Sequence, residues 1–386
     1  MDMQAAFVEE LADLEDWALV ERLLPEGWER QARELGALRR AKGFGDAEAL
    51  LRTLLIHLAG GCSLKETATR AAEGNVAQVS SVAVWKRLRH SGEWFRWMTE
   101  ALMRAWVERL PQEVLPRGHG VERIRRMRLV DASLISEPGD TGSDWRIHYA
   151  VDLRTLRCDF VEVTGVEGGE SLKRFPLAPG DVVFGDRIYA TRAGLHYVVR
   201  QGADAVVRVT TLLPLKTASG KPFALLKKLC KLRCGQVGDW SCWIAPQEPG
   251  AAPFPVRVCA LKKSRIAAQR SREKLRKTAA RKGHHLRAKT VEAAGYVIVL
   301  TTLPAQVLSA EQVLEMYRGR WQIELVFKRL KSILGLGHLP KHDPEGARGW
   351  LHGKLFVAFL VEALLRAGES FFPWGYPLQA QRRVAA

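Results

Sequence analysis

A change in hydrophobic pattern at about residue 121 limits the folds that this chain can adopt. Strand-like segments follow one another there, at 126–136, 144–153 and 158–165. Further strand-like runs then alternate with helical patterns, at 181–186, 204–210 and 296–303. Successive strands followed by strands that alternate with helices predict an α/β domain, in which a mixed sheet carries helices on its faces.

In two of these expected strands, an aspartate ends the apolar run. Asp131 ends the apolar run of RMRLVDASLIS, and Asp186 ends the run in GDVVFGDRIY. Carboxylates at strand ends can converge with a carboxylate from a helix. Such oxygen ligands hold Mg²⁺ while leaving positions open for phosphate and water. The two aspartates are therefore candidate metal ligands.

The segment EMYRGRWQIELVFKRLKSILG supplies a third carboxylate in a helical pattern. On one helix of about 100° per residue, four polar residues fall within an arc of about 60°: Tyr317, Arg320, Glu324 and Lys331. The neighbouring stripe is apolar: Met316, Ile323, Phe327, Leu330 and Leu334. A solvated face with ordinary ion pairs would give the same pattern. The upstream aspartates favour a site in which Glu324 holds a metal and the cations hold phosphates.

These three blocks resemble the DDE transposases of bacterial insertion sequences. The spacing matches, at every position, the group with a Tyr-x2-Arg-x3-Glu-x6-Lys signature. Asp131-Ala132-Ser133 is similar to the family's first aspartate block. Asp186-Arg187-Ile188-Tyr189 is similar to its Asp-Arg-Gly-Tyr block, with Ile188 where glycine is usual. The resemblance covers about residues 45–345.

The resemblance implies a fold, a reaction and a site. The fold would be a ribonuclease H-like α/β domain with a strand-rich insertion. Asp131, Asp186 and Glu324 would be catalytic and would hold two Mg²⁺ ions, with Mn²⁺ as a substitute. Members of the family nick the transposon end, form a DNA hairpin, reopen it and join the end to target DNA. The expected reaction is therefore cut-and-paste transposition, and synapsis of two ends implies a homodimer on double-stranded DNA.

DNA contacts are expected around these carboxylates. Tyr317, Arg320 and Lys331 would grip phosphates beside the scissile bond, and Arg187 and Tyr189 complete this group. A hairpin also requires a displaced base to be held, often by an aromatic side chain. The sequence offers several candidates for that role: Tyr296, Trp240 and Trp243.

Other carboxylates compete for the metal role. Asp152 is the strongest rival, because it also lies at the end of an expected strand. The remaining rivals are Asp140, Asp144, Asp159, Glu162, Asp181 and Glu315. Sequence order and motif context favour Asp131, Asp186 and Glu324.

The positive charge of the chain is concentrated in one segment. The formal net charge is +17, and residues 261–290 hold twelve Lys or Arg against Glu273 alone, a net +11. Such a concentration indicates a polyanion, most simply nucleic acid, although a disordered solubilising run has the same composition. DNA contacts are predicted from five of these residues: Lys274, Arg276, Lys277, Arg281 and Lys282.

The N-terminal part is predicted to be helical and to contain a helix-turn-helix. Asp46 can cap a first helix, Ser63 with Glu66 can open a second, and Ser81 can cap a third. DNA reading and plain bundle packing both remain open for the third helix. Its candidate DNA contacts are Lys86, Arg87 and Arg89.

The expected domains follow from these patterns. They are a helical DNA-binding region at 1–118, a catalytic domain at 119–210 and 291–345, a basic strand-rich insertion at 211–290, and a helical tail at 346–386. The acidic start lacks the basic segment of a secretory signal, and the longest apolar stretch, 355–365, is too short for a bilayer. We therefore expect a bacterial cytoplasmic, nucleoid-associated protein with neither membrane nor small-molecule partners.

Two other functions stay open on the sequence. A ribonuclease H-like nuclease would cut DNA without joining strands. A regulator derived from a transposase would bind DNA with an inactive site, although the intact carboxylates argue against this.

Overall fold

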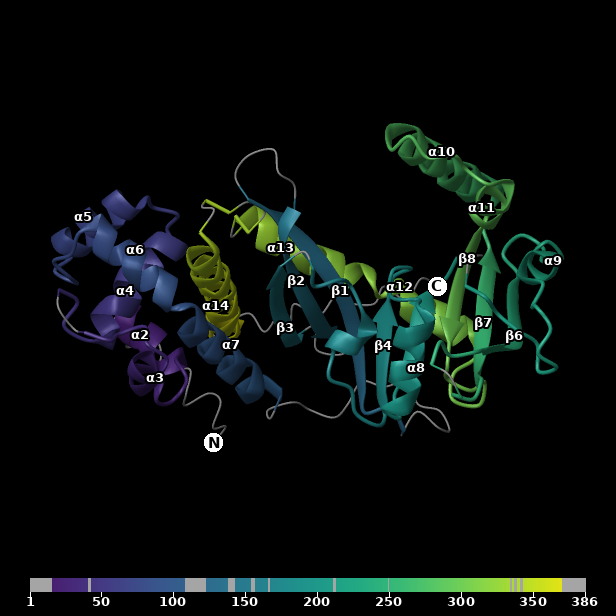
Figure 1. The fold of residues 1–386 in the computed structure, drawn as a ribbon, viewed down its shortest axis with the longest axis horizontal. Coiled ribbons are helices and arrows are strands. Elements are labelled where there is room, and N and C mark those ends of the chain that lie inside the picture. Colours follow the sequence, from purple (N-terminus) through teal and green to yellow (C-terminus); the bar gives the residue numbers. More distant parts are fainter. Residues whose placement is uncertain are drawn as a thin grey trace. The chain divides into compact units, whose positions relative to one another are not determined.

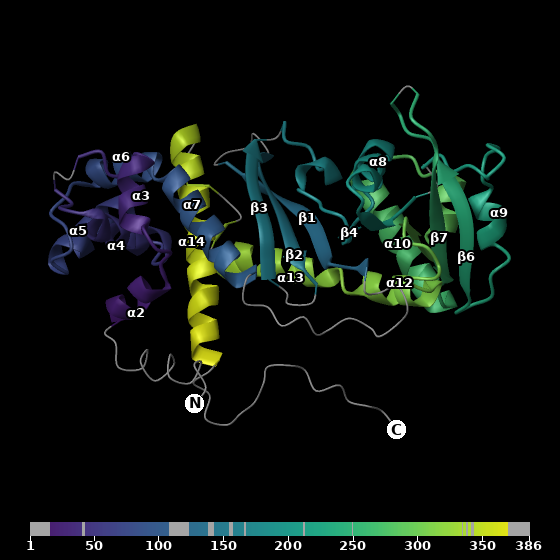
Figure 2. The same cartoon turned by 90° about the horizontal axis from the view of Figure 1, so that it is seen from below.

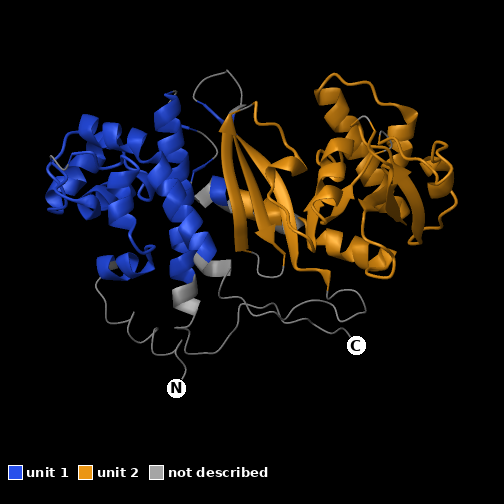
Figure 3. Ribbon diagram, turned by 60° about the horizontal axis from the view of Figure 1, so that its bottom comes forward, with its two compact units in different colours: residues 1–110, 135–145, 329–386 blue, residues 111–134, 146–328 orange. Residues whose placement is uncertain are grey.

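The computed structural model divides the chain into two compact units (Figure 3). Unit 1 comprises Met1–Leu110, Ile135–Trp145 and Arg329–Ala386, and unit 2 comprises Pro111–Leu134 and Arg146–Lys328. The residues that the structure describes are 16–40, 43–107, 123–137, 143–153, 157–165, 167–210, 213–248, 250–333, 335–336, 339–340 and 343–369.

Unit 1 is mainly helical (Figure 1). Its helices are α2 (Asp16–Leu23), α3 (Trp28–Glu34), α4 (Ala47–Leu58), α5 (Leu64–Glu73), α6 (Ser81–His90), α7 (Gly92–Val107) and α14 (Pro344–Glu369). Asp46 caps α4 by accepting a hydrogen bond from the Ala49 N–H at 2.8 Å, and Ser63 caps α5, both as predicted. The predicted cap of α6 was one residue off, because Ser80 accepts the hydrogen bond from Ala83.

The C-terminal helix α14 packs closely on the N-terminal helices, including α6 and α7. Glycines make this approach feasible: a Cβ atom on Gly349 would lie 2.0 Å from the Leu88 carbonyl oxygen. The rings of Phe95 and Phe356 stack 5.7 Å apart across the same contact. The helix expected at 346–386 as a tail therefore completes the core of unit 1, while residues 370–386 lie outside the described part.

Unit 2 is built on an eight-stranded sheet with the order β3-β2-β1-β4-β5-β8-β7-β6. The strands are β1 (Arg126–Ser136), β2 (Ser143–Asp152), β3 (Arg157–Gly165), β4 (Asp181–Gly185), β5 (Asp204–Arg208), β6 (Val237–Ile244), β7 (Phe254–Lys262) and β8 (Tyr296–Thr301). β1, β4 and β5 pair in parallel, whereas β8, β7 and β6 extend the sheet in antiparallel pairs. The predicted insertion thus contributes two strands to the same sheet.

Helices cover both faces of this sheet (Figures 1 and 2). One face packs on the 3-10 helix η2 (Leu172–Arg174) and α8 (Arg192–Arg200). The other face carries α12 (Ala310–Arg318) and α13 (Trp321–Ile333). The remaining helices are α9 (Leu225–Leu229), α10 (Arg265–Arg281) and α11 (Ala288–Ala293). This mixed sheet with flanking helices confirms the predicted architecture and fits a ribonuclease H-like transposase domain.

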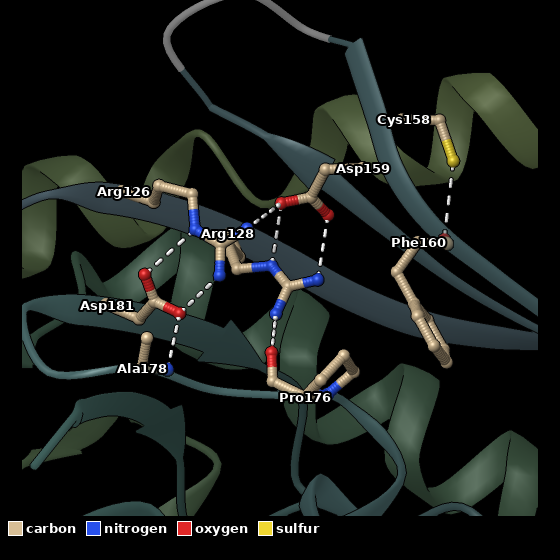
Figure 4. A network of polar contacts seen from close by, with 8 residues as sticks. All are labelled: Arg126, Arg128, Cys158, Asp159, Phe160, Pro176, Ala178 and Asp181. Atoms are coloured by element: carbon tan, nitrogen blue, oxygen red, sulfur yellow. Dashed lines mark hydrogen bonds and ion pairs between the residues drawn. The ribbon is translucent and has the colours of Figure 1, made fainter. Parts of the chain in front are cut away.

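A buried network of charges fixes one end of the parallel strands (Figure 4). Arg126 donates from Nε to Asp181 at 2.8 Å, and the Nη2 of Arg128 donates to Asp159 at 2.9 Å. Burial by itself raises the pKa of Asp181. The hydrogen bond from Arg126 and the nearby positive charges outweigh burial, so the pKa is lowered overall. Such pairing offsets the cost of burying charge. Asp159 and Asp181, considered above as rival metal ligands, are therefore committed to joining β1, β3 and β4.

None of the helices in the described part of the chain has the length and apolar character needed to cross a bilayer.

The packing of α14 can be tested at Gly349, which lies against α6. Gly349→Ala should lower the free energy of unfolding by about 1–3 kcal/mol, because the added methyl group forces α14 away from α6. Thermal or urea unfolding would measure the loss. Gly169→Ala is the control, because no atom lies within 4 Å of its added methyl group. Unchanged stability in Gly349→Ala would contradict the close approach.

Candidate active site

The pairing of β1 with β4 brings the two predicted aspartates to the same level of the sheet. Leu129 lies opposite Phe184 in parallel register. Continued by two residues, this register brings Asp131 level with Asp186, which directly follows β4, and the Asp186 charge acts on the Asp131 carboxyl. Because β1 continues to Ser136, Asp131 lies within the strand and not at its end, which corrects the prediction. Neighbouring strands are about 4.8 Å apart, which is within the reach of two carboxylates that share metal ions.

The turn after β4 holds Asp186 in place. Its Oδ1 accepts a hydrogen bond from the Ile188 N–H at 2.7 Å. The Ile188 backbone is not in the positive-φ region, so the residue fits where the family usually has glycine. Arg187 and Ile188 are exposed. Tyr189, predicted above to contact DNA, is fully buried, and its ring packs against Phe175. Its contact with DNA stays a prediction.

Asp131 lies in a region of concentrated negative charge. Burial raises the pKa of its carboxyl to about 6, opposed by a hydrogen bond from the Ala132 N–H at 2.9 Å. The Asp186 charge raises this pKa further, and the Arg320 charge lowers it. The donor chemistry and this negative potential both suit a divalent cation.

Glu170 is a carboxylate near this site that sequence reasoning missed. Burial raises its pKa, Arg146 opposes the effect, and the Asp186 charge adds to it. The Arg146 Nε lies 3.8 Å from a Glu170 oxygen. Glu170 ends no strand and has no helical spacing to the other carboxylates. No local signal therefore marks it, and only the folded chain brings it close.

The predicted signature helix is broken in two, which corrects the expectation of one continuous helix. Gly319 and Arg320 form a turn between α12 and α13. Their N–H groups bond three residues back, from Gly319 to Met316 and from Arg320 to Tyr317. A Cβ atom on Gly319 would lie 3.0 Å from a Leu153 methyl carbon, so the turn passes close to the end of β2. As a result, Glu324 lies in the first turn of a new helix.

Arg320 links carboxylates from two elements. Its Nη1 lies 3.9 Å from Asp131 on β1, and its Nη2 donates a hydrogen bond to Glu324 on α13. The Arg320 side chain is 19% exposed and that of Glu324 is 58% exposed. In the described residues, no group of three acidic, His or Cys side chains is arranged to hold a metal ion. Asp131, Asp186 and Glu324 therefore do not form a ligand group among the described residues, and a guanidinium lies between two of them.

Tyr317 and Lys331 occupy different environments. Tyr317 is buried, and within the described part of the chain its hydroxyl has no hydrogen bond of good geometry. Burial raises its pKa to about 12, and Arg320 opposes the rise. Lys331 is exposed on α13. It follows Glu324 by seven residues, about two helical turns, and so it shares a face of the helix with Glu324.

The remaining rival carboxylates have other settings. Glu162 pairs with Arg174 at 3.1 Å, and Glu315 pairs with Arg318 at 2.8 Å on an exposed face. Asp152 is buried at the end of β2. Asp140 and the Asp144 side chain lie outside the described residues.

The cations of α6 differ in how available they are. Arg87 donates to the main-chain carbonyl of Ala37, and Arg89 pairs with Asp343 at 3.0 Å. Both guanidinium groups therefore hold the helical unit together. Lys86 is exposed. DNA contact by any of the three stays a prediction.

The basic segment forms helix α10, which stands beyond the ends of β7 and β8 (Figure 1). The buried Ala268 and Ala279 mark its packed side. On the outward side, four exposed cations follow one another at spacings of four, three and four residues: Arg270, Lys274, Lys277 and Arg281. At about 100° per residue they share an arc of about 60°. Arg276 lies on another face, and Lys282 caps the helix end.

The aromatic candidates for holding a displaced base also differ in exposure. Tyr296 is only 7% exposed, and the Lys262 ammonium lies 5.8 Å from its ring. Trp240 and Trp243 are half-buried on β6, the edge strand. The two tryptophans are thus more accessible than the tyrosine.

Comparison with known proteins identifies the family. A family model described as "Transposase DDE domain" matches residues 126–360. The chain is 36% identical over 353 residues to a putative transposase, InsL, for insertion sequence element IS186A of Escherichia coli K12, covering 90% of this chain and 93% of that protein. The transposase for IS421 of Escherichia coli is 36% identical over 354 residues, with the same coverage. The transposase for IS231B of Bacillus thuringiensis subsp. berliner is 22% identical over 386 residues, covering 90% and 78%. This chain therefore belongs to the DDE transposases of bacterial insertion sequences.

Proposed function

We propose that this transposase cuts and joins DNA at the ends of an insertion sequence by two-metal phosphoryl transfer. The observation that carries the proposal is the proximity of Asp131 in β1 to Asp186 directly after its parallel partner β4, with Glu324 linked to Asp131 through Arg320. Oxygen ligands of this kind suit Mg²⁺, with Mn²⁺ as a substitute. When bound, two such ions activate the attacking oxygen and stabilise the leaving oxygen.

The protein's own residues position the reactants. Asp131 is held in the sheet and Asp186 by its turn, so neither needs to reorganise during the reaction. Glu324 is exposed on α13, so DNA bound at this surface can reach its carboxylate. Tyr317, Arg320 and Lys331 provide the phosphate grip, with Arg187 exposed next to Asp186. A hairpin intermediate would require a displaced base, and Trp240 and Trp243 are the accessible aromatics for holding it.

The rest of the chain would bind DNA and assemble the complex. Residues 1–118 form the proposed DNA-binding region, and α14, which covers the described part of the proposed tail at 346–386, packs on its helices. In the catalytic domain at 119–210 and 291–345, the basic insertion at 211–290 would contact the backbone of duplex DNA. A homodimer would synapse the two transposon ends, in a cytoplasmic, nucleoid-associated setting.

The carboxylates are the first test. Asp131→Asn, Asp186→Asn and Glu324→Gln should each abolish Mg²⁺-dependent cleavage of DNA carrying the ends of the element. Binding to the ends should be retained, because it depends mainly on the cations. Glu315→Gln is the control, because Glu315 is an exposed partner of Arg318 on α12. Gel analysis of nicked, hairpin and joined products reads the result. Robust cutting by any one of the three variants would remove that residue from the site.

The same products separate a transposase from a nuclease. Parent protein given end DNA and target DNA should yield joined strands. Cleavage that never leads to joining, with the target in excess, would favour the nuclease.

The outward stripe of α10 is the second test. Lys274→Gln with Lys277→Gln should lower the slope of log affinity against log salt by about 1.8, because each lost phosphate contact contributes about 0.9. Arg265→Gln with Lys289→Gln removes the same charge from exposed positions of the basic segment outside the stripe and is the matched control. Equal slopes for the two double variants would mean that the stripe makes no local contact.

Lys331 is the third test. Lys331→Gln should slow single-turnover cleavage of pre-bound end DNA by roughly tenfold or more, because it removes a cation where charge develops. Lys328→Gln, also exposed on α13, is the matched control. If both variants cleave at the parent rate, Lys331 lies outside the phosphate grip.

A further inference from the structure

We infer that Arg320 stands in for metal charge in the free protein, and that metal ions must displace it before the site is complete. Arg320 is thus a positioning residue with two successive sets of partners: the carboxylates before metal binding, and DNA phosphate afterwards. The inference rests on the proposed function, because it takes Asp131 and Glu324 as metal ligands.

The geometry carries the first part. The guanidinium lies 3.9 Å from an Asp131 oxygen and donates to a Glu324 oxygen, so one cation spans a strand residue and a helix residue. Both Arg320 and Asp131 are mostly buried, with side chains 19% and 20% exposed. Charge pairs of that exposure are less screened by water than surface pairs. The contact is therefore more than an ordinary solvated ion pair.

The position of Arg320 is set by the chain rather than by the ion pairs alone. The Arg320 N–H donates to the Tyr317 carbonyl at 3.1 Å, and the Arg320 carbonyl accepts a hydrogen bond from the Ile323 N–H at 3.3 Å. The turn between α12 and α13 thus fixes the start of the side chain. The arginine side chain has several rotatable bonds, so a change of partner requires side-chain rotation and no shift of the turn.

A divalent ion and the Arg320 guanidinium compete for the same two carboxylates. An ion held by Asp131 and Glu324 would also repel the guanidinium. The released guanidinium keeps its preference for oxyanions, and a DNA phosphate at the site offers two suitable oxygens. Metal binding is therefore opposed by Arg320 in the free protein, and DNA relieves that opposition.

The test is metal binding to the full-length protein without DNA. Free Mn²⁺ measured by electron paramagnetic resonance gives the dissociation constant of the parent and of the variants. Arg320→Gln should bind Mn²⁺ roughly tenfold more tightly, because a competing unit charge is gone. It should also cleave end DNA more slowly, because the phosphate contact is lost. A residue with a purely structural role would not change these two readouts in opposite directions.

Three further variants make the result specific. Arg318→Gln removes the same charge two residues away, where Arg318 pairs with the exposed Glu315, and should leave Mn²⁺ affinity unchanged. Arg320→Lys keeps the cation and should remain close to the parent in Mn²⁺ affinity. Arg320→Met is a second neutral variant that replaces Arg320→Gln if thermal melting shows that the latter is unfolded.

The outcomes separate this inference from the proposed function. Parental or weaker Mn²⁺ binding by the folded neutral variants would overturn the role of Arg320, provided that Asp131→Asn and Glu324→Gln weaken Mn²⁺ binding. If those two carboxylate variants bind Mn²⁺ as the parent does, the metal site itself is wrong, and the role of Arg320 fails with it.

Discussion

The parallel pairing of β1 with β4 is the contact on which the rest of unit 2 depends. One register sets Arg126 opposite Asp181 at the start of the strands. Continued by two residues, it brings Asp131, within β1, level with Asp186, which directly follows β4. These two levels are five residues apart, about 16 Å along the sheet. One end therefore buries charges that neutralise each other, and the other leaves carboxylates whose charges do not cancel. A slip of one residue would turn the aspartates to opposite faces and also break the buried ion pairs.

The same sheet gives the basic helix a rigid base. β7 pairs with β8 over six residues, from Arg257 opposite Thr301 to Lys262 opposite Tyr296, and α10 follows β7 directly. Lys262 and Lys263 begin the basic segment but serve the fold, because their ammonium groups bind main-chain carbonyls of Leu232 and Ala294. The cations further along α10 have few such partners and face solvent. Charge in this segment is thus divided between holding the helix to the sheet and presenting cations outward.

The sequence was informative wherever one residue's role is set by its neighbours in the chain. Asp131 and Asp186 could be singled out because each ends an apolar run, and the caps of α4 and α5 because their spacing is local. Contacts across the fold left no such mark. The turn at Gly319 lies close to Leu153, and Arg87 and Arg89 bind partners that are distant in the chain. Glu170 and the buried Tyr189 likewise required the folded sheet. The specific role of each site residue in DNA cleavage remains a prediction.

The docking of α14 has a consequence for how the protein is made. The helices of α4 to α7 leave the ribosome early, but the surface that covers them is encoded at residues 344–369. At about 5–20 residues per second, the N-terminal helices wait roughly 10–50 s for their last packing partner. During that interval the α6 backbone at Leu88 and the Phe95 ring have no α14 to cover them. A product of early termination would therefore be an aggregation-prone fragment, and not a free-standing helical domain able to compete with the full-length protein.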